Sequence, residues 1–300
     1  MIARWVKSDL EIPAALYQGL SIYLLFAIGL KGGVAISETS PADLVWPIIG
    51  TLFLGVVTPA SAFFILRKLG RLDRTNAAAT AAHYGSVSAV TFLAAIEAAR
   101  NGGFEPEKFL PALVAILEVP GIIIGLMLAQ SKRKGGMKAA LHEVVVGKSI
   151  LLLIGGMVIG ALCGAQKIDG VAPFFIAPFK GVLCLFLLEL GMVAARRITD
   201  LKEAGWRLIL VGCLLPVFHG VLGTFVGILV GMSPGGAAVL GAMAGSASYI
   251  AAPAAVRIAL PKASPGIYLT LALGVTFPFN LAFGIPLLLW FASYCENLFA

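Results

Sequence analysis

The stretch HYGSVSAVTFLAAIEAA, residues His83–Ala99, recurs in the second half of the chain as MAGSASYIAAPAAVRIAL, residues Met243–Leu260. Both copies contain the pattern Gly-Ser-x-Ser followed by small residues. The shared positions, 160 residues apart in each case, are Gly85, Ser86 and Ser88 in the first copy and Gly245, Ser246 and Ser248 in the second. Gly29–Ile36 and Glu189–Ile198 resemble one another at a similar offset. We therefore expect the chain to consist of two related halves.

The composition around these motifs is typical of a protein embedded in lipid. Of the 300 residues, 59% are hydrophobic and 12% are charged, whereas a soluble domain carries roughly 25% charged residues. So few charges cannot cover the surface of a water-soluble fold of this size. The basic residues behind the net charge of +7 are scattered singly through short connections, which argues against a nucleic-acid-binding surface.

Nine segments contain the roughly 20 mostly apolar residues that a membrane-spanning helix needs. They are residues 12–34, 43–68, 74–99, 107–130, 143–164, 173–197, 203–230, 234–258 and 265–294. The two Gly-Ser-x-Ser copies lie on the third and the eighth span, so an odd number of crossings separates them and they point in opposite directions. The sequence thus predicts an all-α polytopic membrane protein with an inverted-topology repeat.

This repeat divides the chain into a first half, residues 1–130 with four visible spans, and a second half, residues 143–300 with five spans. Residues 131–142 form the predicted cytoplasmic linker between them. Two inverted five-helix repeats make a ten-helix transporter fold, and nine spans are visible. The first half starts where the second helix of the unit is expected, so we expect that its first helix is missing from this sequence.

The distribution of basic residues predicts the orientation. By position, 17 of the 22 Lys and Arg lie on or beside the side of the membrane that holds the N-terminus. Basic residues in short loops mark the cytoplasmic side. We therefore expect a cytoplasmic N-terminus and a C-terminus on the outer side.

The two Gly-Ser-x-Ser segments are the candidate substrate site. Inverted-repeat transporters bind their solute near the bilayer midplane, where broken helices from both halves face each other and half-helix N-termini attract anions. Glycine allows close backbone approach, and serine hydroxyls donate to an anion. The predicted cavity contains the side chains of Ser86, Ser88, Thr91, Ser246 and Ser248, with Gly85 and Gly245 beside them. The alternative is that these small residues only pack the helices tightly.

Glu118 is the candidate ion ligand, because ionisable groups inside a membrane are costly and usually functional. It lies two residues before Pro120, where we expect the span to be interrupted, and its carboxylate suits Na⁺ or a proton. Thr276 and Asn280, around Pro278, are the predicted neutral counterparts in the second half. Two further embedded carboxylates, Glu97 and Glu189, lie near predicted helix ends and are as well explained by reaching the interface.

These features predict a secondary active transporter rather than an enzyme. The chain contains no Walker phosphate loop, HExxH zinc pair or GxSxG elbow, so uphill transport would draw on an ion gradient. Two other readings remain open. One is a permease for a small organic acid, and the other is a membrane subunit that senses a solute without moving it.

With these residues in view, the chain resembles the sodium-dependent bicarbonate permease family of bacteria over almost its whole length. The segments that carry the resemblance are Gly29–Ile36 (GLKGGVAI), Gly85–Thr91, Leu117–Pro120, Pro216–Gly220 and Gly245–Arg257. The resemblance implies ten helices in two inverted repeats, a gate part and a core part, and homotrimers in the bacterial inner membrane. It also implies HCO₃⁻ uptake coupled to inward Na⁺ by an elevator-like movement, no other cofactor, and a PII-like cytoplasmic regulator.

The chain differs from the best-studied pattern of that family in both motifs. The first motif has Ala89 and Val90 where that pattern has more hydroxyls, and the second has Tyr249 where it has an aspartate. A phenol in place of a carboxylate changes both the charge and the size of the cavity. We therefore include Tyr249 among the predicted substrate-binding residues, and we expect bicarbonate or a similar small anion as substrate.

Overall fold

The computed structural model describes residues 12–129, 138–139, 142, 145–197 and 205–299, and all its regular structure is helical. The long helices are α2 (Ala14–Glu38), α3 (Pro41–Lys68), α6 (Leu110–Leu128), α8 (Lys148–Asp169), α10 (Phe179–Arg197), α12 (Trp206–Leu229) and α17 (Ile285–Phe299). The shorter ones are α4 (Arg74–Tyr84), α5 (Ala89–Asn101), α9 (Ala172–Phe175), α13 (Pro234–Ala244), α14 (Ala251–Ala259), α15 (Pro265–Leu269) and α16 (Phe277–Phe279). The predicted linker, 131–142, falls almost entirely outside the described residues.

Eight helical stretches within the described residues are long and apolar enough to cross a membrane. They match eight of the nine predicted spans, although α8 runs to Asp169 rather than ending at residue 164. The remaining predicted span, 234–258, is divided into α13 and α14, and neither piece reaches the length of a span. The structure therefore supports a polytopic α-helical membrane protein, while the count of nine spans stays a prediction.

The outer surface of the helices is apolar, as contact with lipid requires. On α3, large exposed side chains recur along one face and include Trp46, Ile49, Phe53 and Phe64. Similar faces on α8 and α12 carry Leu151, Ile154, Val158 and Leu162, and Leu210, Leu214, Phe218 and Phe225. The buried polar side chains of α3 and α12 include Thr51, Thr58, His219 and Thr224.

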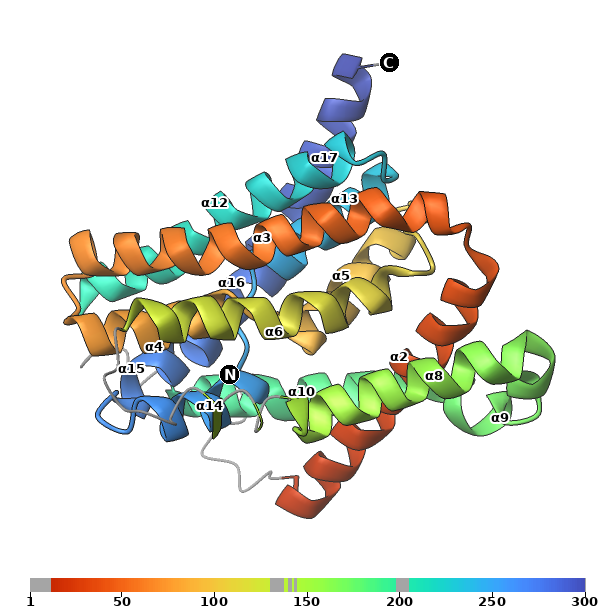
Figure 1. Ribbon diagram of the computed structural model, residues 1–300, viewed down its shortest axis with the longest axis horizontal. Helices are drawn as coiled ribbons and strands as arrows, with labels where there is room; N and C mark the ends of the chain where they lie inside the picture. The colour runs from red at the N-terminus through yellow and green to blue at the C-terminus, as the bar shows by residue number, and fades with distance from the viewer. Residues whose placement is uncertain (1–11, 130–137, 140–141, 143–144, 198–204, 300) are drawn as a thin grey trace.

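Two groups of helices are visible in Figure 1, with α3 and α12 along one side and α8 and α10 on the opposite side, where α2 crosses α8. The GLKGG segment of α2 explains that crossing. A Cβ atom on Gly33 would lie 2.0 Å from the backbone oxygen of Met157, and one on Gly29 would lie 2.4 Å from that of Leu153. Small residues thus let α2 and α8 pack backbone against backbone.

The predicted interruption at Pro120 is wrong, because α6 continues through this residue. A proline removes one hydrogen bond and crowds the preceding turn, and α3 leaves room for it: a Cβ on Gly55 would lie 3.1 Å from Pro120 Cβ. Around Pro278 the chain also remains helical, but with widened π turns at Thr270–Thr276 and Asn280–Gly284. Such turns are frequent at functional sites.

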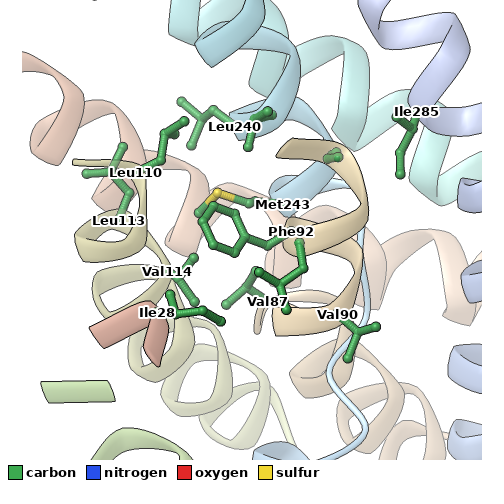
Figure 2. Close-up of a cluster of buried hydrophobic side chains, with 14 of the residues drawn as sticks. Ile28, Val87, Val90, Phe92, Leu110, Leu113, Val114, Leu240, Met243 and Ile285 are labelled. Carbon is green, nitrogen blue, oxygen red and sulfur yellow. The ribbon is translucent and has the colours of Figure 1, made fainter. Parts of the chain in front are cut away.

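The buried hydrophobic side chains form two clusters, and one of them joins α5, α6 and α13. Figure 2 shows Phe92 of α5 beside Met243 of α13, with Val114 of α6 close by. Val87, which lies between α4 and α5, belongs to the same cluster. The core thus anchors both Gly-Ser-x-Ser segments and fixes their positions relative to one another.

Candidate functional site

Both Gly-Ser-x-Ser segments interrupt their helices. The chain leaves α4 after Tyr84 and enters α5 at Ala89, and it leaves α13 after Ala244 and enters α14 at Ala251. Ser88 has an extended backbone, with φ −91° and ψ 109°. Serine favours such breaks because its hydroxyl can replace a backbone hydrogen-bond partner. The structure therefore supplies two broken helices, as the motifs predicted.

The two breaks contact each other reciprocally. The backbone N–H of Ser88 donates to Ser246 Oγ at 2.8 Å, and the N–H of Ser248 donates to the backbone oxygens of His83 at 2.8 Å and Ser86 at 3.1 Å. Ser88 and Ser86 correspond to Ser248 and Ser246 under the offset of 160 residues. The same motif positions therefore meet from both sides, with a hydroxyl as acceptor in one bond and a backbone oxygen in the other.

The half-helices that start at the crossing differ in their capping. Ser88 Oγ accepts a hydrogen bond from the N–H of Thr91 at 3.3 Å and so caps α5. The N-cap of α14 is Ile250, whose side chain provides no cap, and the N–H of Ala252 donates to Ser248 Oγ in a longer bond of 3.5 Å. A helix N-terminus carries partial positive charge, and the first turn of α14 is the more loosely capped of the two, so the start of α14 suits an anion.

A cavity of about 10 Å³ lies at the crossing. Its polar lining consists of Ser88, Glu118, Ser149, Ser248 and Tyr249. A space of this size holds about one water molecule, or a single ion. The crossing therefore brings together four of the predicted site residues and one that the sequence did not indicate.

Two polar groups at the crossing are buried and have no hydrogen-bond partner among the described residues. They are the hydroxyls of Ser86 and Tyr249. Glu118 is also buried, with 6% of its surface exposed. Buried polar groups are normally satisfied, so unpartnered ones point to a water, an ion or a ligand.

The other predicted residues lie around the crossing without lining this cavity. Gly121 packs so closely on the first break that a Cβ there would lie 1.7 Å from the backbone oxygen of Gly85. In the second half, Asn280 Nδ2 donates to the backbone oxygen of Gly245 at 2.9 Å. Thr91, Ser86 and Ser246 also surround the crossing rather than the cavity, and Ser246 is occupied with Ser88.

Thr276 lies in a second polar layer beside the crossing. Its hydroxyl bonds to Tyr84 Oη at 2.5 Å and donates to the backbone oxygen of Gly212 at 2.9 Å. Together with Asn280 it ties the widened helix to α4, α12 and the second break. In the structure these two residues hold the crossing together, and their predicted role as ion ligands stays a prediction.

Ser149 on α8 was missed by sequence reasoning. It is buried and lines the cavity opposite the two breaks. It lies one residue after Lys148, at the start of a span, where a serine carries no signal of its own. Only the packing of α8 on α2 shows that it reaches the crossing.

Comparison with known proteins adds one result. The family described as the Na⁺-dependent bicarbonate transporter superfamily has a model that matches residues 1–293. No curated protein matches the chain.

Proposed function

Because the chain belongs to the Na⁺-dependent bicarbonate transporter superfamily, we propose that it is a secondary active transporter that carries bicarbonate, or a similar small anion, together with Na⁺. The observation that carries the proposal is the crossing of two broken helices around an ion-sized cavity with a buried carboxylate. A purely structural crossing would have no reason to bury Glu118 beside unpartnered hydroxyls, because both are costly.

We assign the anion to the start of α14. The helix N-terminus there supplies partial positive charge, and the hydroxyls of Ser88, Ser248 and Tyr249 can donate to carboxylate-like oxygens. The cavity expands when the anion enters, since about 10 Å³ admits only a single small ion in the present conformation. The anion therefore enters by an opening movement of the surrounding helices.

We assign Na⁺ to Glu118. A buried carboxylate needs a compensating charge or a proton, and an oxygen ligand suits a hard cation. The bound Na⁺ balances the Glu118 carboxylate, and the partial positive charge at the start of α14 offsets part of the charge of the anion, which lowers the cost of moving both through the membrane. One Na⁺ per HCO₃⁻ is electroneutral, so the drive then comes from the Na⁺ concentration ratio alone.

The wider architecture belongs to the same proposal. The reciprocal hydrogen bonds at the crossing support two inverted repeats, and the grouping of α2, α8 and α10 supports a gate part that moves against the rest. Homotrimers in the bacterial inner membrane, a cytoplasmic N-terminus, an outer C-terminus and a PII-like regulator follow from the family resemblance.

Uptake of ¹⁴C-bicarbonate by proteoliposomes, with and without a Na⁺ gradient, tests the proposal. We expect saturable Na⁺-dependent uptake that Glu118→Gln and Ser248→Ala reduce at least tenfold. Glu105→Gln and Ser293→Ala are matched controls, since Glu105 is exposed and Ser293 hydrogen-bonds only within its own helix. Both controls should transport normally.

Other outcomes separate the alternatives. Uptake of small organic acids in preference to bicarbonate would favour an organic-acid permease with Tyr249 in its pocket. Saturable bicarbonate binding with no flux in any gradient would favour a sensing subunit. Neither flux nor binding of bicarbonate in correctly inserted protein would contradict the assignment of the substrate.

A further inference from the structure

A second cavity opens at the end of the bundle where α2 ends and α10 begins. Its volume is about 520 Å³, roughly fifty times that of the cavity at the crossing. Pockets for organic ligands range from about 300 to 1,000 Å³. This vestibule, lined by α2, α5, α8, the starts of α6 and α10, and the loops before them, is therefore large enough for an organic molecule.

Several basic residues from different helices lie together at the vestibule. Of the five Lys and Arg outside the side rich in basic residues, Lys31, Arg100 and Lys108 line it. Lys180 reaches it through an ion pair of 2.8 Å with Glu97. Such a concentration at one cavity is unexpected for residues that only anchor helix ends.

Around Glu97 the positive charges outnumber the negative one. Arg100 lies 3.7 Å from the Glu97 carboxylate, in addition to Lys180. Lys31 interacts with the charges of all three, yet forms no salt bridge within the described residues, and its Nζ lies over the ring of Phe179 at 4.2 Å from the centroid. Three cations therefore surround one carboxylate, and Lys31 is the least exposed of them, since the side chains of Arg100 and Lys180 are 48% and 69% exposed.

Beside this cluster the wall of the vestibule is apolar. Phe92, Leu93 and Ile96 of α5 and Ile28 of α2 supply that surface. The carboxylates that also line the cavity are Glu38, Glu107 and Asp169, and Glu107 already accepts a hydrogen bond from the Ser233 N–H. Because these carboxylates balance the other charges of the lining, the surplus of positive charge is confined to the cluster around Glu97. The ligand that complements this cluster and the apolar wall beside it has one anionic head and an apolar body.

The vestibule also lies in line with the crossing. Ile28 and Leu93 line both the vestibule and a small apolar cavity. That cavity in turn shares Leu25, Ala89 and Ile250 with the cavity at the crossing. The vestibule is therefore separated from the crossing by one small cavity and the side chains that wall it.

We propose that the vestibule is a binding site for an amphipathic organic monocarboxylate, with the carboxylate at Lys31 and Arg100 and the apolar body against α5. Binding in the vestibule does not depend on transport through the crossing. When the crossing takes up its anion from the vestibule end, the bound carboxylate inhibits that transport.

Equilibrium binding of ¹⁴C-phenylacetate to the purified full chain in nanodiscs tests the proposal. We expect saturable binding that the neutral phenylacetamide and the cationic phenethylamine do not displace. Lys31→Met should weaken it about tenfold, whereas Lys31→Arg should keep it. Lys262→Met, an exposed lysine outside the vestibule lining, should have no effect.

A second variant keeps every charge and removes space instead. Ile96→Trp fills the vestibule from its partly buried wall and should also abolish binding, so it decides the matter if Lys31→Met does not fold. Absence of saturable binding by the parent protein, equal displacement by phenylacetamide, or unchanged binding by Ile96→Trp would each overturn the proposal. Because binding is measured without flux, its failure is distinct from a failure of the transport assignment.

Discussion

The first broken span, α4 with α5, and the second, α13 with α14, start in the same way. Asp73 caps α4 by accepting from the N–H groups of Thr75 and Asn76, and Ser233 caps α13 by accepting from the N–H of Gly236. After the break they differ in degree: Ser88, the N-cap of α5, accepts from Thr91 N–H at 3.3 Å, whereas the N-cap of α14 is Ile250 and Ser248 Oγ accepts from Ala252 N–H at 3.5 Å. The end of the second span is therefore the more loosely capped of the two and the more available to a ligand.

The contacts that hold the two breaks in place differ in one respect. Both breaks pack against backbone: Gly121 lies on Gly85, and a Cβ on Gly245 would lie 2.5 Å from the backbone oxygen of Pro216 on α12. The second break also receives a side-chain hydrogen bond, from Asn280 Nδ2 to the backbone oxygen of Gly245. Backbone contact has no freedom to adjust, whereas a side chain can change rotamer, so we infer that the Asn280 contact is the adjustable one.

The largest expected effect is that of Gly121→Ala, which places a methyl group 1.7 Å from the Gly85 backbone oxygen. Overpacking usually costs about 1–3 kcal/mol, and we expect about 3 kcal/mol or more, since two backbones must separate. Thermal unfolding in nanodiscs measures the loss, and uptake should disappear with it.

Gly155→Ala on α8 is the control for this substitution, because no atom lies within 4 Å of the added Cβ. It should leave stability unchanged or raise it slightly, as alanine favours helix over glycine. Equal stability of the two variants would break the comparison, because the first crossing contact would then be as adjustable as the second.

The second span is probed by Asn280→Ala. This change leaves the buried backbone oxygen of Gly245 without its amide donor, which costs about 1–3 kcal/mol. We expect a smaller loss of stability than for Gly121→Ala and a partial loss of uptake. Asn101→Ala, exposed at the end of α5, is the control, and a loss as large as that of Gly121→Ala would contradict an adjustable second contact.

Much of this arrangement follows from the sequence, because it depends on patterns that lipid and backbone impose. Apolar length predicts the spans, and a Gly-Ser-x-Ser motif repeated 160 residues later predicts two breaks that meet. Charge content predicts a membrane protein without any contact information. Each of these signals is local or is repeated within the chain.

The features that the sequence did not indicate depend on packing between distant helices. Pro120 stays helical because Gly55, far away on α3, makes room for its ring. Ser149 reaches the cavity because α8 packs on α2, and Glu97 forms an ion pair with Lys180 from another helix. Such partners cannot be predicted from the residues on either side of a position.

Two tyrosines allow a structural hydroxyl to be compared with a proposed ligand-binding hydroxyl. Tyr84 Oη is bonded to Thr276 at 2.5 Å, whereas Tyr249 Oη is buried without a partner among the described residues. We expect Tyr84→Phe to lower the free energy of unfolding by about 1 kcal/mol with little change in the KM for the anion. Tyr249→Phe should leave stability unchanged and raise KM several-fold.

Thermal unfolding and uptake at varied bicarbonate concentration separate these two effects. Loss of stability by Tyr249→Phe, with KM unchanged, would mean that its hydroxyl has a structural partner and that the anion lies elsewhere. Tyr294→Phe, at an exposed position on α17, is the control for removing a hydroxyl.

The smallest expected effect concerns the distant caps that the two spans have in common. Asp73→Ala removes the acceptor of the Thr75 and Asn76 N–H groups, at 2.9 and 3.1 Å, and should cost about 1 kcal/mol without changing KM. Ser233→Ala should cost less, because the Glu107 carboxylate still accepts from the backbone N–H of residue 233. Differential scanning fluorimetry measures the difference in stability between the two variants. A shift in KM by either variant would show that the caps of α4 and α13 are coupled to the crossing. The two spans would then differ before their breaks as well as after them.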